Sequence, residues 1–212
     1  IYSLSVLLFS FGVFLIAVLG FAKRRDIIAQ RFAFFSLSVC WWGFWYAFWT
    51  SQNYSPEKTL QLIKISELSA VFIPITWLHF VMEFVGKKEP FKYFYAGNYI
   101  LAAALAAFCP TPWFFTGVHP VPVFHYYKTG GPIFYVFLAV FLILVPYAFY
   151  HLINAYRTAT GEVKKQLRYL VLGWLISFIA GGATFLPVFN ITGFLFILCL
   201  MPLYPVFVGL AL

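Results

Sequence analysis

The sequence predicts an all-α integral membrane protein, a bundle of seven transmembrane helices with its N-terminus outside and its C-terminus in the cytoplasm. Of the 212 residues, 63% are hydrophobic and only 9% are charged, whereas an average soluble domain has about 25% charged residues. A chain of this length holds about seven apolar spans of ~20 residues joined by short connections. We therefore expect residues 1–212 to form a single seven-transmembrane domain.

The first three spans follow from apolar runs and their boundaries. Ile1–Ala22 is continuously apolar and precedes a basic cluster without a small-residue cleavage pattern, so it is expected to be a true span. A second helix is expected over Arg31–Thr50 and a third over Thr59–Val85. Pro74 lies in the middle of the third helix, where a proline removes a backbone hydrogen bond and predicts a kink.

The second half of the chain contains one long loop and four further spans. Pro110 and Pro112 end the fourth helix, because proline cannot continue a helix. The segment Trp113–Gly131 contains prolines that disfavour helix in the residues before them, which indicates a short hairpin or lid over the bundle. Asn190 is expected to be a turn residue between the last two helices. The four expected helices are Tyr93–Phe108, Pro132–Ala155, Gln166–Val188 and Thr192–Leu212.

The basic residues divide unequally between the two sides of the expected bundle. Short cytoplasmic loops accumulate Lys and Arg, so the side with the larger share is expected to be cytoplasmic. A net charge of +8 does not indicate nucleic acid binding, because these residues lie in loops between apolar runs. Eleven of the fourteen lie on one side, namely Lys23, Arg24, Arg25, Arg31, Lys87, Lys88, Lys92, Arg157, Lys164, Lys165 and Arg168, which leaves Lys58, Lys64 and Lys128 on the other.

The third expected helix carries ionisable residues, which are costly in a bilayer and usually functional. Lys64 and Glu67 are three residues apart and are expected to pair with each other on the face that turns into the bundle. They lie near the point where an outer pocket would open, which makes them candidate ligand contacts. The alternative is that this pair is purely structural.

A stripe of tryptophans on the second expected helix is the other candidate for a binding site. Trp41, Trp45 and Trp49 are spaced four residues apart and therefore lie on one face. Such a stripe serves either for packing at a membrane interface or as the wall of a pocket for an apolar or cationic ligand.

No pattern in the chain indicates catalysis. Cys40, Cys109 and Cys199 lack metal-ligand spacing, and His119 and His125 have no carboxylate or cysteine nearby, so no metal or cofactor is expected. No phosphate-binding loop or phosphoacceptor histidine is present in these 212 residues. The chain by itself is therefore not expected to be an enzyme.

Several short motifs follow one another at characteristic spacing along nearly the whole chain. They are Arg31–Val39, Phe72–Pro74, Leu78–Phe84, Tyr127–Pro132, Gln166–Leu170, Gly181–Phe189 and Pro202–Pro205. In their order and spacing these motifs resemble the seven-transmembrane N-terminal sensor region of bacterial histidine kinases. The resemblance implies a membrane receptor in a two-component system, located in the cytoplasmic membrane and continued by signalling modules through which it forms a homodimer.

We expect this sensor to bind a small apolar or amphipathic ligand, or to respond to the state of the bilayer around it. Pro202 and Pro205 interrupt the last span, so they are candidates for transmitting a signal towards the cytoplasm. Two alternatives stay open, a small-solute transporter or channel and a scaffolding subunit of a membrane complex. A continuous polar path would favour the first, and co-purification from native membranes the second.

Overall fold

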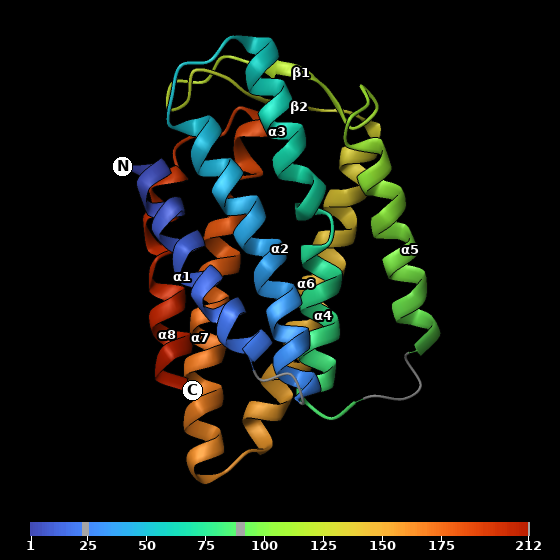
Figure 1. The fold of residues 1–212 in the computed structure, drawn as a ribbon, viewed down its shortest axis with the longest axis vertical. Helices are drawn as coiled ribbons and strands as arrows, with labels where there is room; N and C mark the ends of the chain where they lie inside the picture. The colour runs from blue at the N-terminus through green and yellow to red at the C-terminus, as the bar shows by residue number, and fades with distance from the viewer. Residues whose placement is uncertain (23–25, 88–91, 212) are drawn as a thin grey trace.

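The computed structural model describes residues 1–22, 26–87 and 92–211, which form helices along one long axis with a small hairpin across one end (Figure 1). The N-terminus lies towards the hairpin end and the C-terminal helix towards the opposite end. The elements are α1 (Tyr2–Ala22), α2 (Ile27–Thr50), α3 (Pro56–Ala70), α4 (Ile73–Phe84), α5 (Lys92–Phe108), β1 (Phe115–His119), β2 (Tyr127–Gly130), α6 (Pro132–Thr158), α7 (Gly161–Ala183), η1 (Leu186–Phe189), η2 (Leu195–Leu200) and α8 (Leu203–Ala211).

Two helices begin several residues earlier than expected because polar residues cap them. The Asp26 carboxylate accepts hydrogen bonds from the backbone N–H groups of Ile28 and Ala29 at 2.9 and 3.3 Å, so α2 begins at Ile27. The Ser55 hydroxyl caps α3 in the same way, with proline in the first turn. Such caps satisfy N–H groups that have no partner within the helix.

The expected kink at Pro74 is present and is a complete break between α3 and α4. Proline has no N–H group to donate to the Ala70 carbonyl, and its ring crowds that oxygen. The chain therefore turns at Val71 and Phe72 and starts a new helix with Pro74 in its first turn. Together the two helices form one apolar stretch of 29 residues.

The expected hairpin is confirmed. Strands β1 and β2 pair in antiparallel register, with Val118 opposite Lys128 and His119 opposite Tyr127. The hairpin lies across the end of the bundle (Figure 1). Both β2 and β1 contact α3, and β2 also contacts α6 and η1.

The prediction of a continuous seventh helix is wrong. Residues 192–212 contain the 3₁₀ segment η2, a turn at Met201 and Pro202, and the short helix α8. Pro202 cannot donate to the Leu198 carbonyl, and the Met201 N–H instead bonds Leu198 at 3.2 Å in a tighter turn. The sixth span also ends early, at Ala183, and Asn190 has φ 61°, which confirms the expected turn.

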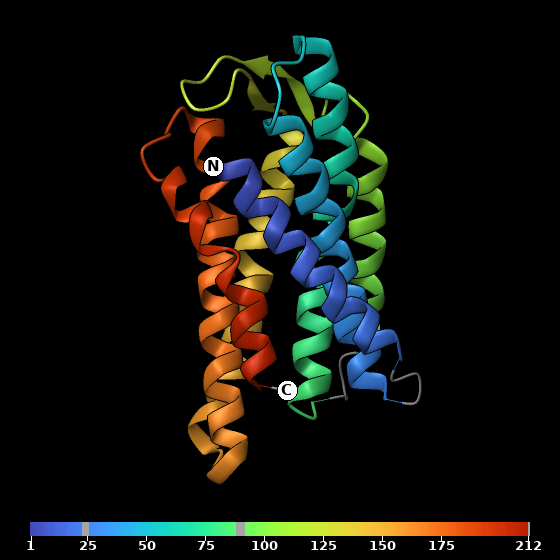
Figure 2. The ribbon, with the colours of Figure 1, turned by 60° about the vertical axis from the view of Figure 1, so that its left-hand side comes forward.

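Among the described residues, five helical stretches are long and apolar enough to cross a membrane, and the apolar stretches 93–108 and 195–210 are shorter. At 1.5 Å per residue the 17 residues of α5 extend about 25 Å. Helix α5 stands apart from the others in Figure 1, whereas α1 packs on α2 and α8 and is inclined across the bundle in Figure 2.

In the described part of the chain, more basic residues lie at the end of the bundle away from the hairpin, around the start of α2, the end of α4 and the α6–α7 connection, than at the hairpin end, where Lys58, Lys64 and Lys128 lie. Lys23, Arg24, Arg25 and Lys88 of the expected cluster lie outside the described residues, as does the side chain of Lys92.

Candidate functional site

A buried ion pair joins the hairpin to the helices. The Lys128 ammonium on β2 donates to Glu67 Oε1 on α3, and the two side chains are 2% and 3% exposed. The expected pairing of Lys64 with Glu67 is therefore wrong. Lys64 Nζ instead donates to the Pro110 carbonyl at 2.8 Å, near the end of α5. Of the two lysines, Lys128 is the one that reaches the buried carboxylate.

The pair is enclosed by aromatic rings and is only partly satisfied. Lys128 Nζ lies 5.6, 5.5 and 5.8 Å from the ring centroids of Phe115, Phe134 and Phe185, within the range of cation–π attraction. Glu67 Oε2 is buried and has no hydrogen-bond partner in the described structure. A buried carboxylate oxygen without a partner is costly, so this atom is a strong acceptor for any hydrogen-bond donor that reaches it.

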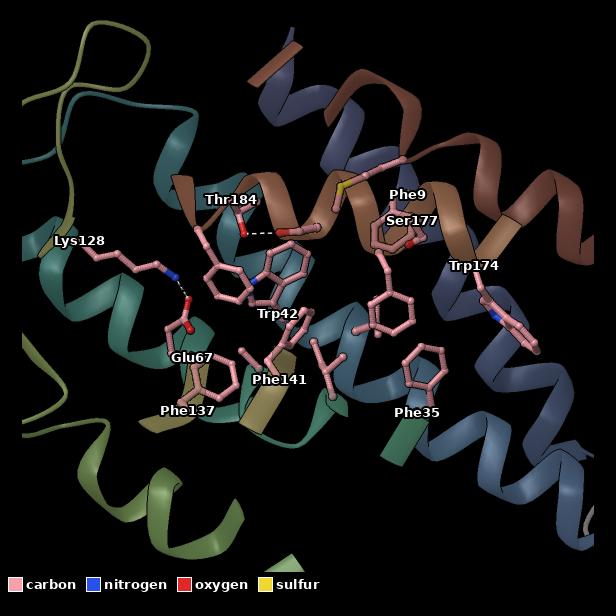
Figure 3. A pocket seen from close by; sticks show the side chains of 17 residues that line it. Phe9, Phe35, Trp42, Glu67, Lys128, Phe137, Phe141, Trp174, Ser177 and Thr184 are labelled. Atoms are coloured by element: carbon pink, nitrogen blue, oxygen red, sulfur yellow. Dashed lines mark hydrogen bonds and ion pairs between the residues drawn. The ribbon is translucent and has the colours of Figure 1, made fainter. Parts of the chain in front are cut away.

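Glu67 and Lys128 form the polar end of an otherwise apolar cavity (Figure 3). Six helices and the hairpin contribute to its wall, including Phe9 of α1, Phe141 of α6 and Trp174 of α7. Its volume is about 50 Å³, enough for a few water molecules at roughly 10–15 Å³ each. Ligand sites of drug-sized molecules measure about 300–1,000 Å³, so a larger molecule requires side chains in the wall to move.

The tryptophan stripe does not wall this cavity. Trp41 is 47% exposed and donates its indole N–H to the Ile65 carbonyl at 3.0 Å. Trp45 is half-buried between aromatic neighbours, and Trp49 is buried beneath the hairpin, where it packs on Tyr127 and Phe124. The tryptophan of α2 that lines the cavity is Trp42, one residue from the stripe.

Hydrogen bonds also tie the hairpin to the end of α7. The Tyr127 hydroxyl donates to the Thr184 carbonyl at 2.5 Å, and burial raises the pKa of Tyr127 well above its ordinary value, so the phenol keeps its proton. His119 Nε2 lies 3.2 Å from the Pro187 carbonyl and Nδ1 lies 3.0 Å from the Thr129 hydroxyl. A carbonyl only accepts, so Nε2 is the donor in the contact with Pro187. The hairpin thus bonds two carbonyl groups that follow α7, that of Thr184 through Tyr127 and that of Pro187 through His119.

Pro202 and Pro205 occupy different environments on the last segment. Pro202 lies in the turn between η2 and α8, whereas Pro205 packs on α1, where a Cβ atom at Gly12 would come within 2.6 Å of its ring. On the α7 side, a Cβ atom at Gly173 would meet Phe207 at 2.8 Å. The two glycines let α8 lie close to α1 and α7. Tyr204 of α8 also accepts a hydrogen bond from the Trp174 indole of α7 at 3.1 Å.

Lys128 is the site residue that sequence reasoning missed. The sequence groups it only with two other basic residues on the hairpin side, although it follows a tyrosine in a segment rich in aromatic residues. A charged residue in apolar surroundings is usually paired with an opposite charge, and Glu67 is the buried acidic residue of α3. In the described parts of the chain, no three His, Cys, Asp or Glu side chains group as metal ligands.

Comparison with known proteins agrees with the architecture. The family model described as the N-terminal 7TM region of histidine kinase matches residues 5–208. No curated protein and no solved structure matches the chain significantly. The family is the membrane sensor region and not the catalytic kinase domain, which agrees with the expectation that this chain is not itself an enzyme. The chain, with its apolar spans and buried charge pair beneath a hairpin, belongs to the family of N-terminal seven-transmembrane regions of histidine kinases.

Proposed function

We propose that this sensor region detects a small apolar or amphipathic molecule, or a change in the bilayer, through the cavity at Glu67 and Lys128. The observation that carries the proposal is the buried ion pair whose second carboxylate oxygen has no partner among the described residues. Buried charges without full compensation oppose stability and are usually retained for function. A molecule that enters the cavity and donates a hydrogen bond to this oxygen would change the strength of the interaction between Glu67 and Lys128.

We also propose the orientation that places the hairpin outside and the α6–α7 connection in the cytoplasm. The support is the unequal distribution of basic residues in the sequence, together with the larger number of described basic residues in segments at the end away from the hairpin. In a bacterium this places the protein in the cytoplasmic membrane, with the bilayer as its surroundings and the cavity nearer the outer side. We infer no nucleic acid partner, and we propose a homodimer formed through cytoplasmic output domains.

Strand β2 provides the proposed route from the cavity to the C-terminal segment. Its consecutive residues contact different parts of the bundle: Tyr127 bonds the end of α7, Lys128 bonds α3, and Thr129 bonds the histidine that reaches η1. Movement of Lys128 therefore displaces neighbours that hold the carbonyls of Thr184 and Pro187, which follow α7. From there the chain continues through η1 and η2 to α8.

Pro202 and Pro205 take part in this route in a way that differs from a hinge within one long helix. The break at Pro202 lets α8 move as a short unit, and Pro205 holds that unit against α1. A ligand shifts such an equilibrium only by the difference in its affinity for the two states. The pair supplies that difference if one state exposes the free carboxylate oxygen to the ligand and the other does not.

The test uses the full-length histidine kinase with its own output domains in membrane vesicles. Lys128→Met removes the ammonium and is expected to change basal autophosphorylation in either direction and to abolish its response to lipid extract. Lys64→Met is the matched control, because Lys64 lies one turn from Glu67 but bonds a loop carbonyl outside the cavity.

Unchanged output and response in Lys128→Met would contradict the proposal. Equal effects in the two lysine variants would also contradict it, because a general loss of positive charge would then explain the result. The transporter alternative is not favoured, because the described wall of the cavity is apolar except for the ion pair, Ser177 and Thr184.

A further inference from the structure

An apolar groove lies on the bilayer side of the same cavity, between α6, α7 and η1. Its volume is about 340 Å³, which falls within the range of small-molecule sites. Its lining includes Leu138, Leu142, Gly182 and Phe189. Leu142 and Phe189 are 60% and 48% exposed, so the groove opens to the surface that the acyl chains of the bilayer cover.

Aromatic rings separate this groove from the cavity. Phe141, Phe178 and Phe185 line both spaces, and the ring of Phe141 lies 5.1 Å from Phe185 and 6.1 Å from Phe178. Phenylalanine rings form no hydrogen bonds with one another, so a rotation of these side chains opens a passage without breaking a hydrogen bond. Phe185 also lies 5.8 Å from the Lys128 ammonium, so the charged pair stands directly behind this wall.

The chemistry at the inner end restricts the head group of a molecule that uses this passage. Glu67 Oε2 needs a hydrogen-bond donor, because Lys128 already bonds the other oxygen. An anionic head would face the carboxylate and compete with it for Lys128, and a purely apolar molecule would leave Oε2 unsatisfied. An uncharged hydroxyl donates to Oε2 and leaves the ion pair intact.

We infer that the ligand is a single-chain amphiphile with an uncharged hydroxyl head, which enters from the bilayer between α6 and α7. Its tail lies in the groove, and its head passes the phenylalanine wall to donate to Glu67 Oε2. This inference names the ligand class of the proposed sensor site and therefore rests on the proposed function.

The test is photo-crosslinking of the full chain in lipid nanodiscs with dodecanol that carries a diazirine in its alkyl chain. Labelled peptides are expected from residues 138–146 and 178–189. Gly182 lines the groove, and a Cβ atom at that position meets nothing within 4 Å, so Gly182→Leu is expected to place its side chain in the groove. We expect it to lower labelling there roughly fivefold or more, the result of a steric overlap of about 1 kcal/mol. Gly97→Leu on α5 is the matched control, equally open but outside the groove, and should label like the wild type.

The head group is tested by competition with unlabelled dodecanol, dodecane and dodecanoate. Dodecanol alone is expected to compete well. Equal competition by dodecane would overturn the inference, because the groove would then take up any apolar chain. Labelling spread evenly over all lipid-facing helices would overturn it as well. The readout is covalent labelling, so its failure leaves the effect of Lys128→Met on kinase output, the test of the proposed function, unaffected.

Discussion

Removal of one partner of the buried pair should destabilise the bundle more than removal of both. Lys128→Met leaves the Glu67 carboxylate buried with neither oxygen bonded to a cation, since Oε2 is already without a partner in the described structure. Loss of one partner from a buried pair typically costs about 3–5 kcal/mol. The double variant Glu67→Met with Lys128→Met has no buried charge at this point, and replacement of a buried ion pair by apolar residues is often neutral or stabilising.

The expected change in melting temperature follows from these free energies. For soluble domains of about 150–250 residues, 1 kcal/mol shifts the midpoint by roughly 2–4 °C. On that scale Lys128→Met should melt about 6–20 °C below the wild type. The double variant should recover most of this loss. The assay is thermal unfolding of the purified chain in one detergent, followed by intrinsic fluorescence, with Lys64→Met as the control for loss of a lysine.

Two results would refute this reasoning. If Lys128→Met has the same melting temperature as the wild type, an unpaired Glu67 carboxylate does not destabilise the bundle. If the double variant is as unstable as the single one, the methionine side chain that replaces Lys128 itself disturbs the packing, and the cost does not come from an unpaired carboxylate.

Three further predictions concern the hairpin, the last helix and the topology. Tyr127→Phe removes the hydroxyl bonded to the α7 end and leaves a buried carbonyl unsatisfied, so thermal unfolding should show a loss of about 1–3 kcal/mol; a wild-type midpoint would contradict this. Gly12→Leu forces α1 away from Pro205 and should cost about 1–3 kcal/mol in the same assay; no loss would mean that α8 moves aside freely and that Pro205 does not hold it. With the native cysteines replaced, His125→Cys should react with an impermeant thiol reagent in intact cells and Thr160→Cys only after lysis; the reverse pattern would invert the topology.

Much of the fold follows from the position of apolar runs and prolines in the sequence. The helix break near Pro74, the hairpin in the proline-containing loop and the turn at Asn190 are predicted from local chemistry and are present in the structure. Local signals determine these features, because a proline or a left-handed residue acts on its immediate neighbours. The 3₁₀ segment before Pro202 does not follow from the sequence pattern, because a proline predicts an interruption of the helix but not the hydrogen bonding of the residues on either side of it.

The candidate site is less predictable because its key contact joins distant parts of the chain. Helical spacing places Lys64 and Glu67 on one face, but spacing within a helix does not determine which cation approaches from a loop. Lys128 is 61 residues from Glu67, and only the folded hairpin brings them together. The tryptophans show a second limit of spacing. Their spacing groups Trp41, Trp45 and Trp49 on one face of the helix but does not say which face turns inward, and the structure turns Trp42 into the cavity.

The most direct test of the account asks whether the ion pair controls the position of α8. Spin labels at exposed Leu19 of α1 and Leu210 of α8, in a chain without native cysteines, report the distance between these helices in nanodiscs. We expect Lys128→Met to shift the distance distribution by about 1–2 Å, the size of helix movements in switching proteins, while Lys64→Met leaves it unchanged. Distributions that superimpose in all three proteins would contradict a sensor in which the buried pair is coupled to the C-terminal helix.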